Sequence, residues 1–263
     1  MSIRAERQAG SLGAYIEGID LSEPLDDASF KELHSLFLEH HVLCFRDQGH
    51  VTPDQQLAFA ARWGPIFVHP YVPGVEGYPA IMEVVDAVPI TITWHQDTTH
   101  SKTPPRMTIL LARRVPPYGG DTMFANQHLA YEELSTGMKR LLEDLNAVHK
   151  GTELAYQEKG LSIPEVSALH PVVRRHPETG RAALFVNADY TRHLEDMTED
   201  ESRPLLEYLY AHASQARYTW RHHWRVGDLL MWDNPSVQHC VVADANKGER
   251  SLHRVLIEGV APV

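Results

Sequence analysis

The sequence predicts a mainly β protein with flanking helices, whose strands form a sandwich or barrel. The first observation is a run of four short β segments separated by turn residues, at 218–224, 228–232, 238–242 and 253–258. The second is a length of 263 residues without an internal repeat, low-complexity tract or polar linker. Because sandwiches and barrels of this length commonly form one domain, we expect a single domain over residues 1–263.

Two helices and a short strand are expected before the β-rich part of the chain. Residues 26–27 are both aspartate, and either can cap a helix over 28–40. The apolar residues 42–45 then predict a buried strand. Thr52 and Pro53 are typical of an N-cap and a first helical position, so a second helix is expected to begin there.

The middle of the chain predicts further strands and another helix. Residues 80–95 and 105–114 are rich in β-forming side chains, and 182–187 predict one more strand. A serine at the start of 135–145 can cap a helix over that segment.

The last expected helix has two conflicting start signals. Thr198 and Glu201 have the spacing of a capping box, which places the start directly after Thr198. Pro204 disfavours a helix interior, and it indicates a start nearer Ser202.

Composition and charge exclude several classes of protein. Hydrophobic residues make up 43% of the chain and charged residues 22%, which is typical of a globular protein. The formal net charge of −11 argues against a nonspecific binder of nucleic acid or of anionic membranes, since either carries a basic surface. We expect neither a secretory signal nor a membrane span, because the first residues form no apolar segment and nowhere do 18 apolar residues run together. The two cysteines, Cys44 and Cys240, are expected to be packing residues in a cytoplasmic protein.

Two histidines and an aspartate form the pattern that carries the expected chemistry. His95 and Asp97 could point to one face of a strand, and His239 follows an apolar strand and a polar turn. Two histidines and one carboxylate cover one face of a metal ion and leave three positions open, as in non-haem Fe(II) oxygenases. Arg250 follows His239 by eleven residues, and its guanidinium suits bidentate binding of a carboxylate.

In this order along the chain, these residues and the segments around them resemble the Fe(II)/2-oxoglutarate-dependent dioxygenases. Within them, the chain is similar to the branch of taurine dioxygenase and 2,4-dichlorophenoxyacetate dioxygenase. The resemblance runs nearly from end to end. The segments that carry it are 18–21, 41–48, 62–64, 94–97, 119–122, 170–173, 176–180, 232–234 and 250–254.

The resemblance implies roles for five residues around the metal and the cosubstrate. His95, Asp97 and His239 would ligate Fe(II). Thr122 would hydrogen-bond the distal end of 2-oxoglutarate through its hydroxyl, and Arg250 would pair with a carboxylate of 2-oxoglutarate.

Substrate contacts are implied in the same way. Arg254 would face the anionic group of the substrate, and His69 would help to hold that group. Tyr190 would be an aromatic substrate contact, and Thr91 stands where taurine dioxygenase has an amide that holds the substrate. Because residues four apart on a strand share a face, Arg250 and Arg254 can line one cavity.

The implied reaction uses Fe(II), 2-oxoglutarate and O₂. It hydroxylates a small organic anion of the sulfonate, alkyl sulfate or aryloxyalkanoate type and converts 2-oxoglutarate to succinate and CO₂. The implied fold is a double-stranded β-helix, or jelly roll, and the implied assembly is a homodimer or homotetramer. Neither nucleic acid nor a membrane is an expected partner.

Departures from the family pattern leave the substrate open. Besides Thr91, a tyrosine near His69 is displaced by one residue, and the segment after His149 is shorter than in taurine dioxygenase. These changes put taurine itself in doubt. One alternative is the same chemistry on an amino-acid-like or carrier-bound substrate. A distant alternative is a noncatalytic β-sandwich binding protein whose histidines hold no iron.

Overall fold

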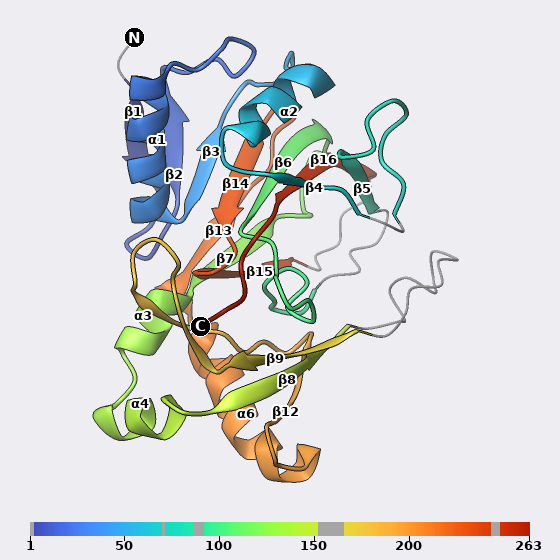
Figure 1. Ribbon diagram of the computed structural model, residues 1–263. Coiled ribbons are helices and arrows are strands. Elements are labelled where there is room, and N and C mark those ends of the chain that lie inside the picture. The colour runs from blue at the N-terminus through green and yellow to red at the C-terminus, as the bar shows by residue number, and fades with distance from the viewer. Residues whose placement is uncertain (1–2, 70–71, 87–91, 152–165, 243–247) are drawn as a thin grey trace.

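The computed structural model describes residues 3–69, 72–86, 92–151, 166–242 and 248–263, and a large sheet dominates them (Figure 1). Its strands are β1 (Arg4–Arg7), β2 (Ala14–Glu17), β3 (Val42–Phe45), β4 (Ile66–Phe67), β5 (Met82–Asp86), β6 (Met107–Arg114), β14 (Leu229–Asp233) and β16 (Arg250–Ile257). They follow the order β1-β2-β3-β14-β6-β16-β4, and β5 also pairs with β16. Only the β2–β3 pair is parallel among these described pairings.

A second sheet packs against the large one, and two smaller β units complete the fold. The second sheet has the order β13-β7-β15, formed by β7 (Thr122–Asn126), β13 (Thr219–His222) and β15 (Val237–Val241). A third has the order β12-β8-β9, formed by β8 (Asn146–Lys150), β9 (Ser167–Pro171) and β12 (Thr191–Leu194). The other small unit is a two-stranded antiparallel ribbon of β10 (Val173–Arg175) and β11 (Ala182–Leu184).

The helices lie on the outside of these sheets (Figure 1). Helices α1 (Asp27–His40) and α2 (Pro53–Ala61) cover the large sheet. The smaller β units share a hydrophobic cluster with the remaining helical elements. These are α3 (Gln127–Glu132), α4 (Thr136–Leu142), α6 (Glu199–Ala213) and a 3₁₀ turn (Ala216–Tyr218). No helix within the described ranges is both long and apolar enough to cross a membrane.

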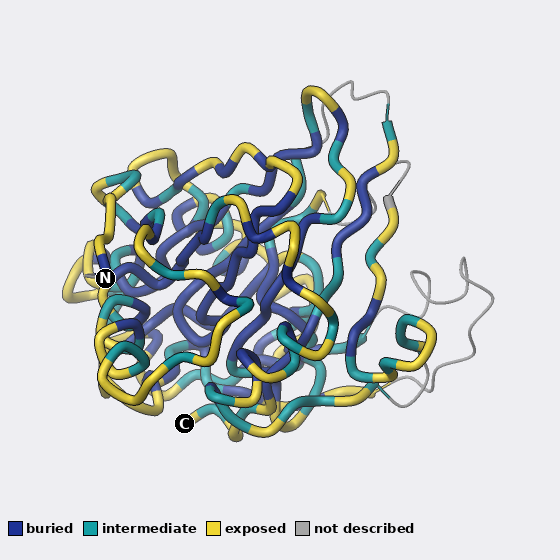
Figure 2. The backbone as a smooth tube through the Cα atoms, turned by 90° about the horizontal axis from the view of Figure 1, so that it is seen from above, coloured by how far each residue is buried: buried dark blue, intermediate teal, exposed yellow. Residues whose placement is uncertain are grey.

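Strand alternation divides the core into two layers. In β3, Leu43 and Phe45 pack under the helices, whereas Val42 and Cys44 point the other way and pack with Phe124 of the second sheet. The same alternation separates neighbouring residues of β6 and β14. Buried chain therefore fills the centre of the molecule in Figure 2. The layer between the two sheets is the one that contains the candidate site.

The predicted starts of the first two helices are confirmed. The Asp26 side chain accepts a hydrogen bond from the backbone N–H of Ser29 and so caps α1. Thr52 and Gln55 form a reciprocal capping box at α2, with Pro53 as the first helical residue. Both starts were visible in the sequence because capping is a local interaction.

The β-rich segment 80–95 contains a strand, whereas the predicted end of another strand is wrong. Strand β5 covers Met82–Asp86 of that segment, and residues 87–91 lie outside the described residues. The strand expected over 182–187 ends at Leu184.

The expected helix start near Ser202 is also wrong. Helix α6 begins at Glu199, because Thr198 and Glu201 form the capping box that their spacing predicts. Pro204 lies inside the helix, where it removes a single backbone hydrogen bond near the N-terminus. The cap and the packing of the helix outweigh that loss.

The β1–β2 hairpin was not predicted. Every residue of β1 is exposed, so its sequence lacks the alternation of apolar and polar residues that marks a half-buried strand. Its pairing with β2 is established by tertiary context at the edge of the large sheet.

Candidate metal centre and active site

The three candidate metal ligands come from two segments that are hydrogen-bonded to each other. The backbone N–H of His95 donates to the carbonyl of His239 at 3.0 Å, and the N–H of His239 donates back at 2.8 Å. His239 is the central residue of β15, and Asp97 follows His95 in a turn. The expected strand geometry at His95 and Asp97 is therefore wrong. An isolated bridge and a turn bring these side chains together instead.

The side-chain atoms of the three residues converge on one point. The Nε2 atoms of His95 and His239 lie 4.0 Å and 3.8 Å from Oδ1 of Asp97. These separations are too long for hydrogen bonds, so the three atoms lie close together without being hydrogen-bonded to one another. All three residues are buried, and the potential ligand atoms lie within 4.8 Å of each other. This arrangement fits a metal ion between them.

A chain of side-chain hydrogen bonds supports Asp97 from behind. The hydroxyl of Thr108 donates to Oδ2 of Asp97 at 2.5 Å, and Asn234 donates to that hydroxyl at 3.0 Å. The indole N–H of Trp232 donates to the amide oxygen of Asn234 at 2.9 Å. Oδ2 is thereby occupied, and Oδ1 faces the histidines. The sequence did not single out Thr108.

The two histidines are held with Nε2 toward the centre. Nδ1 of His95 lies 2.8 Å from the carbonyl oxygen of Thr93, so Nδ1 carries the proton and Nε2 keeps a lone pair. The ring of His239 lies 4.5 Å from that of Trp232 and 4.1 Å from that of His95. Burial and the nearby His95 lower the pKa of His239 to about 3, against the opposing charge of Asp97. His239 is therefore neutral, as a metal ligand must be.

The structure brings together the two residues expected to bind the cosubstrate. Thr122 begins β7, and its hydroxyl accepts a hydrogen bond from the indole N–H of Trp224 at 2.9 Å. Arg250 begins β16, and its Nη1 donates to the carbonyl of Gly120 at 2.9 Å. Gly119 and Gly120 have φ values of 78° and 70°, a region that glycine adopts without strain. This turn places Arg250 beside the segment that leads into Thr122.

Arg254 lies on β16, on the same side of the strand as Arg250, and its charge reaches the candidate metal centre. Its Nη2 approaches Sδ of Met82 at 3.7 Å, and its Nε is buried without an acceptor in the described part of the chain. Burial raises the pKa of Asp97, but the charges of His239, Arg254 and His95 together with the Thr108 hydrogen bond reverse that effect. The pKa of Asp97 is lowered overall, so it is a carboxylate.

The expected substrate contacts lie around the same centre. The ring of Tyr190 is 6.2 Å from that of His95 and 5.1 Å from that of His100. His69 is half-buried, and burial together with the charge of Arg254 lowers its pKa. Thr91 lies outside the described residues. His100, whose ring lies against that of Tyr190, was not given a role from the sequence.

A second cluster of potential ligands is an internal ion pair. Cys44, His222 and Asp228 are buried with their side-chain atoms close together. The Arg46 guanidinium binds Asp228, and Nε2 of His222 lies 3.2 Å from the same carboxylate oxygen. Burial, with the charge of Asp228, raises the pKa of the Cys44 thiol well above its usual value. Cys44 is therefore a protonated core residue, and Arg46 already supplies the positive charge.

Comparisons with known proteins agree with this geometry. Residues 5–256 match the family model described as taurine catabolism dioxygenase TauD, TfdA family. An alkylsulfatase from Acinetobacter baylyi is 32% identical, over 98% of this chain and 85% of that protein. An α-ketoglutarate-dependent 2,4-dichlorophenoxyacetate dioxygenase from Cupriavidus pinatubonensis is 33% identical, over 91% of this chain and 92% of that protein.

A solved structure shows the same likeness in three dimensions. A taurine dioxygenase from Burkholderia xenovorans superposes with a TM-score of 0.89 at 32% identity, over 100% of this chain and 93% of that one. The matches favour an enzyme over the noncatalytic binding protein considered above. The chain therefore belongs to the taurine catabolism dioxygenase TauD, TfdA family, a family of oxygenases that depend on Fe(II), O₂ and 2-oxoglutarate (α-ketoglutarate).

Proposed function

We propose that this protein hydroxylates a small organic anion of the sulfonate, alkyl sulfate or aryloxyalkanoate type, with conversion of 2-oxoglutarate to succinate and CO₂. One observation carries the proposal. A buried trio of two histidines and a carboxylate lies beside two arginines that share one side of β16. Two reactants of this reaction are anionic, and the site provides one guanidinium for each.

The donor set of the trio fits Fe(II). In the proposal His95, Asp97 and His239 hold the ion, because two neutral imidazoles and one carboxylate leave three positions for the cosubstrate and O₂. The Thr108 hydroxyl holds the second oxygen of Asp97, and the carbonyl of Thr93 holds the second nitrogen of His95. Such partners fix the direction in which each ligand points.

Thr122 and Arg250 are the proposed contacts of 2-oxoglutarate. Arg250 is 4% exposed, so a carboxylate that pairs with it is shielded from water and strongly bound. Thr122 is buried nearby and offers a hydroxyl to the same end of the molecule. When bound, Fe(II) with 2-oxoglutarate and O₂ supplies the oxidising power for the hydroxylation.

Arg254, His69, Tyr190 and Thr91 are the proposed substrate contacts. Arg254 has a buried Nε without an acceptor in the described residues, which suits an anionic group. His69 lies close enough for the charge of Arg254 to lower its pKa, and it would bind the group as a neutral donor. Tyr190 borders His95, so it would limit the space beside the metal. These contacts orient the substrate and exclude water.

The proposal extends to the whole molecule. We infer that the two packed sheets are the double-stranded β-helix, or jelly roll, of this family, in a single domain over residues 1–263. We also infer a cytoplasmic homodimer or homotetramer that binds neither nucleic acid nor a membrane. The net charge of −11 supports the absence of nucleic acid.

An anaerobic absorption spectrum tests the proposed metal and cosubstrate sites. Fe(II) and 2-oxoglutarate added together should give a weak visible charge-transfer band in the wild-type protein. His95→Ala and Asp97→Ala should lose the band, while the control His193→Ala should keep it because Nδ1 of His193 bonds only to a nearby backbone carbonyl in the described structure. A folded wild-type protein without the band would contradict the proposal. Succinate release with an alkyl sulfate, a sulfonate and an aryloxyalkanoate then identifies the substrate class.

A further inference from the structure

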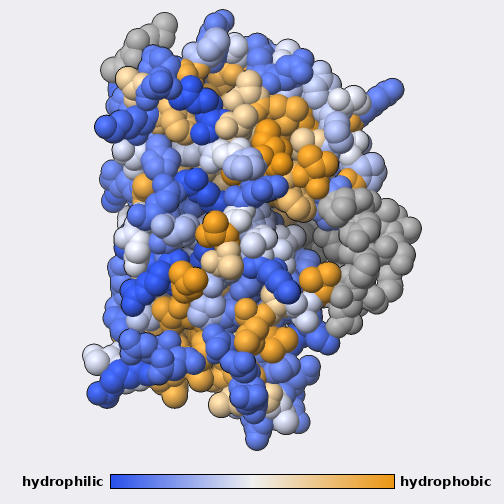
Figure 3. All heavy atoms as spheres, viewed as in Figure 1, coloured by the Kyte–Doolittle hydropathy of each residue, from blue (hydrophilic) through white to orange (hydrophobic). Residues whose placement is uncertain are grey.

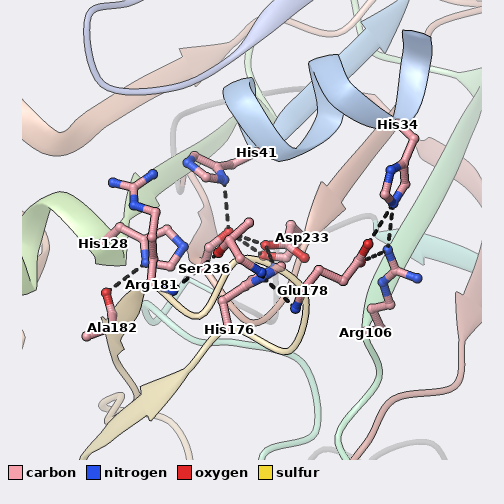
Figure 4. Close-up of polar contacts among 11 residues, drawn as sticks. His34, His41, Arg106, His128, His176, Glu178, Arg181, Ala182, Asp233 and Ser236 are labelled. Atoms are coloured by element: carbon pink, nitrogen blue, oxygen red, sulfur yellow. Dashed lines mark hydrogen bonds and ion pairs between the residues drawn. The ribbon is translucent and has the colours of Figure 1, made fainter. Parts of the chain in front are cut away.

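A cavity lies where the ends of α2 and β16 meet the turn after β14. Its volume is about 250 Å³, and its lining includes Trp63, Arg106, Arg174, Glu178 and Pro235. None of the residues proposed above to bind metal, cosubstrate or substrate lines it. The polar groups of this region are drawn in Figure 4, where Arg106, Glu178 and His34 form one cluster and Asp233, Ser236, His176 and His41 form its neighbour.

Three residues that line this cavity carry buried hydrogen-bond donors without acceptors in the described structure. They are Nε of Arg174, Nε of Arg106 and the indole Nε1 of Trp63. A buried donor without a partner costs free energy, and three around one cavity are unusual. All three are donors that cannot accept, so the missing partner has to be an acceptor.

Arg174 is the least compensated of the three. It is 3% exposed, and its guanidinium lies 4.7 Å from the ring centre of Phe185. No carboxylate or carbonyl in the described ranges accepts a hydrogen bond from it. Burial lowers the pKa of Arg174 to about 10, with the charge of Asp233 opposing, so the side chain is still a cation at neutral pH.

The acidic residues in and near the cavity accept no hydrogen bond from Arg174 in the described structure. Glu178 binds the Arg106 guanidinium and lies 2.8 Å from Nε2 of His34 (Figure 4). Glu258 is exposed to water at the cavity. Asp233 does not line the cavity. Its Oδ2 interacts with His176 at 3.0 Å and with Ser236, and its Oδ1 is buried without a donor in the described residues. Its charge acts on Arg174 without a hydrogen bond between them. The charge of Arg174 is thus partly offset by Asp233, but its guanidinium has no hydrogen-bond acceptor in the described residues and borders a cavity large enough for a small molecule.

We propose that this cavity binds a small oxyanion, a carboxylate or a sulfate, through the guanidinium of Arg174. A planar guanidinium binds the two oxygens of such a group in parallel, and an anion without donors matches the donor-rich lining. The same chemistry covers a free sulfate and the carboxylate of an organic acid. The site is separate from Arg250 and Arg254, so it binds its anion whether or not the reaction proposed above is correct.

Thermal unfolding of the full-length, metal-loaded protein tests this site. Sodium sulfate and sodium acetate are titrated separately, with the ionic strength held constant by sodium chloride. Either oxyanion should raise Tm to a saturating extent, by roughly 3–5 °C at about tenfold excess over Kd. The stronger of the two identifies the class of ligand.

Three variants locate the effect. Arg174→Met should abolish the saturable shift, and Arg174→Lys should weaken sulfate binding at least about tenfold because the fork of donors is lost. Arg175→Met is the matched control, since its side chain is exposed, and it should keep the full shift. A Tm shift that persists in Arg174→Met would place the anion elsewhere and overturn the proposal. If Arg174→Met does not fold, an unchanged Kd in Arg174→Lys would overturn it in the same way. If neither sulfate nor acetate raised Tm more than sodium chloride alone, the proposal would also be overturned. A water molecule between Arg174 and Asp233 would then be the remaining explanation for the buried donor.

Discussion

The hydroxyl of Thr108 determines which oxygen of Asp97 is left for a metal ion. It donates to Oδ2 and at the same time accepts from Asn234, so its proton is committed to Asp97. Asn234 is in turn oriented by the indole of Trp232. One threonine thus connects the strand β6, the turn after β14 and the candidate ligand.

Thr108→Val removes this hydroxyl while keeping the shape of the side chain. We expect the affinity for Fe(II) to fall by about 10- to 100-fold, as is typical when a partner of a metal ligand is lost. Anaerobic calorimetric titration with Fe(II) measures the change in Kd. Thr108→Ser should restore most of the affinity because it keeps the donor.

The control for this experiment is Thr219→Val. Its hydroxyl bonds to the carbonyl of Ala216 on the surface, away from the candidate metal ligands. Wild-type affinity in Thr108→Val would show that the hydrogen bond to Asp97 does not matter for metal binding. Equal losses in both variants would indicate a general effect on folding.

Sequence reasoning found the residues whose spacing along the chain carries their chemistry. His95, Asp97 and His239 are close in the structure, as expected. Thr108 was missed because its contact with Asn234 joins segments far apart in the sequence. His100 was missed because no motif marks its contact with the ring of Tyr190. No local pattern distinguishes Thr108 from other threonines in buried strands.

At the scale of elements, β16 supplies both arginines of the proposed site. Arg250 and Arg254 are four residues apart on a continuous strand that pairs with β5 and β6. An extra residue in β6 near Ser251 interrupts the register there without breaking β16. The two arginines are therefore anchored four residues apart on one continuous strand.

The two arginines should have separable effects on the two reactants. Arg254→Ala is expected to raise KM for the anionic substrate at least about tenfold with little change in that for 2-oxoglutarate, and Arg250→Ala should do the opposite. Succinate formation at varied concentrations of each reactant measures both constants. Arg114→Ala, an exposed residue of β6, is the control for general effects. If Arg254→Ala impaired both reactants equally, its assigned role would be refuted.

The elements were easier to predict where a local signal fixes them. The caps at Asp26, Thr52 and Thr198 are interactions within a few residues, and they form as their spacing predicts. The segment around His95 was not predictable in the same way. Its irregular course is fixed by a bridge to β15, more than a hundred residues away.

At the scale of the whole molecule, buried neutral histidines make the fold sensitive to acid. Burial lowers the pKa of His41 and His149 to about 3 and that of His128 to about 4. In the unfolded chain a histidine binds its proton near pH 6.5, so below that pH the unfolded state takes up more protons than the folded state. The free energy of unfolding therefore falls as the pH decreases from about 6.5 toward 4.

Each of these histidines should contribute up to roughly 1 kcal/mol per pH unit in that range. Urea unfolding at about pH 7 and about pH 5 measures the effect, and the midpoint should be lower at the acidic pH. His149→Gln should reduce the difference between the two midpoints. The same midpoint at both pH values would show that these histidines do not titrate on unfolding.

Charge is distributed unevenly over the molecule. The face in Figure 3 is mostly hydrophilic, with hydrophobic residues in separate patches. The chain as a whole carries −11, yet Arg250 is buried and Arg254 lies beside the trio. Local positive charge in the interior can thus attract an anion that the surface as a whole does not.

The backbone bridge between His95 and His239 has a consequence for how such a protein can change. The spacing of the two imidazoles is set by two main-chain hydrogen bonds, which do not depend on the identity of the side chains nearby. His69 and Tyr190, the proposed substrate contacts, belong to other segments, so their replacement is expected to alter what is recognised and to leave the ligand spacing intact. The architecture separates the machinery that handles oxygen from the surface that selects its target, and the two can diverge independently.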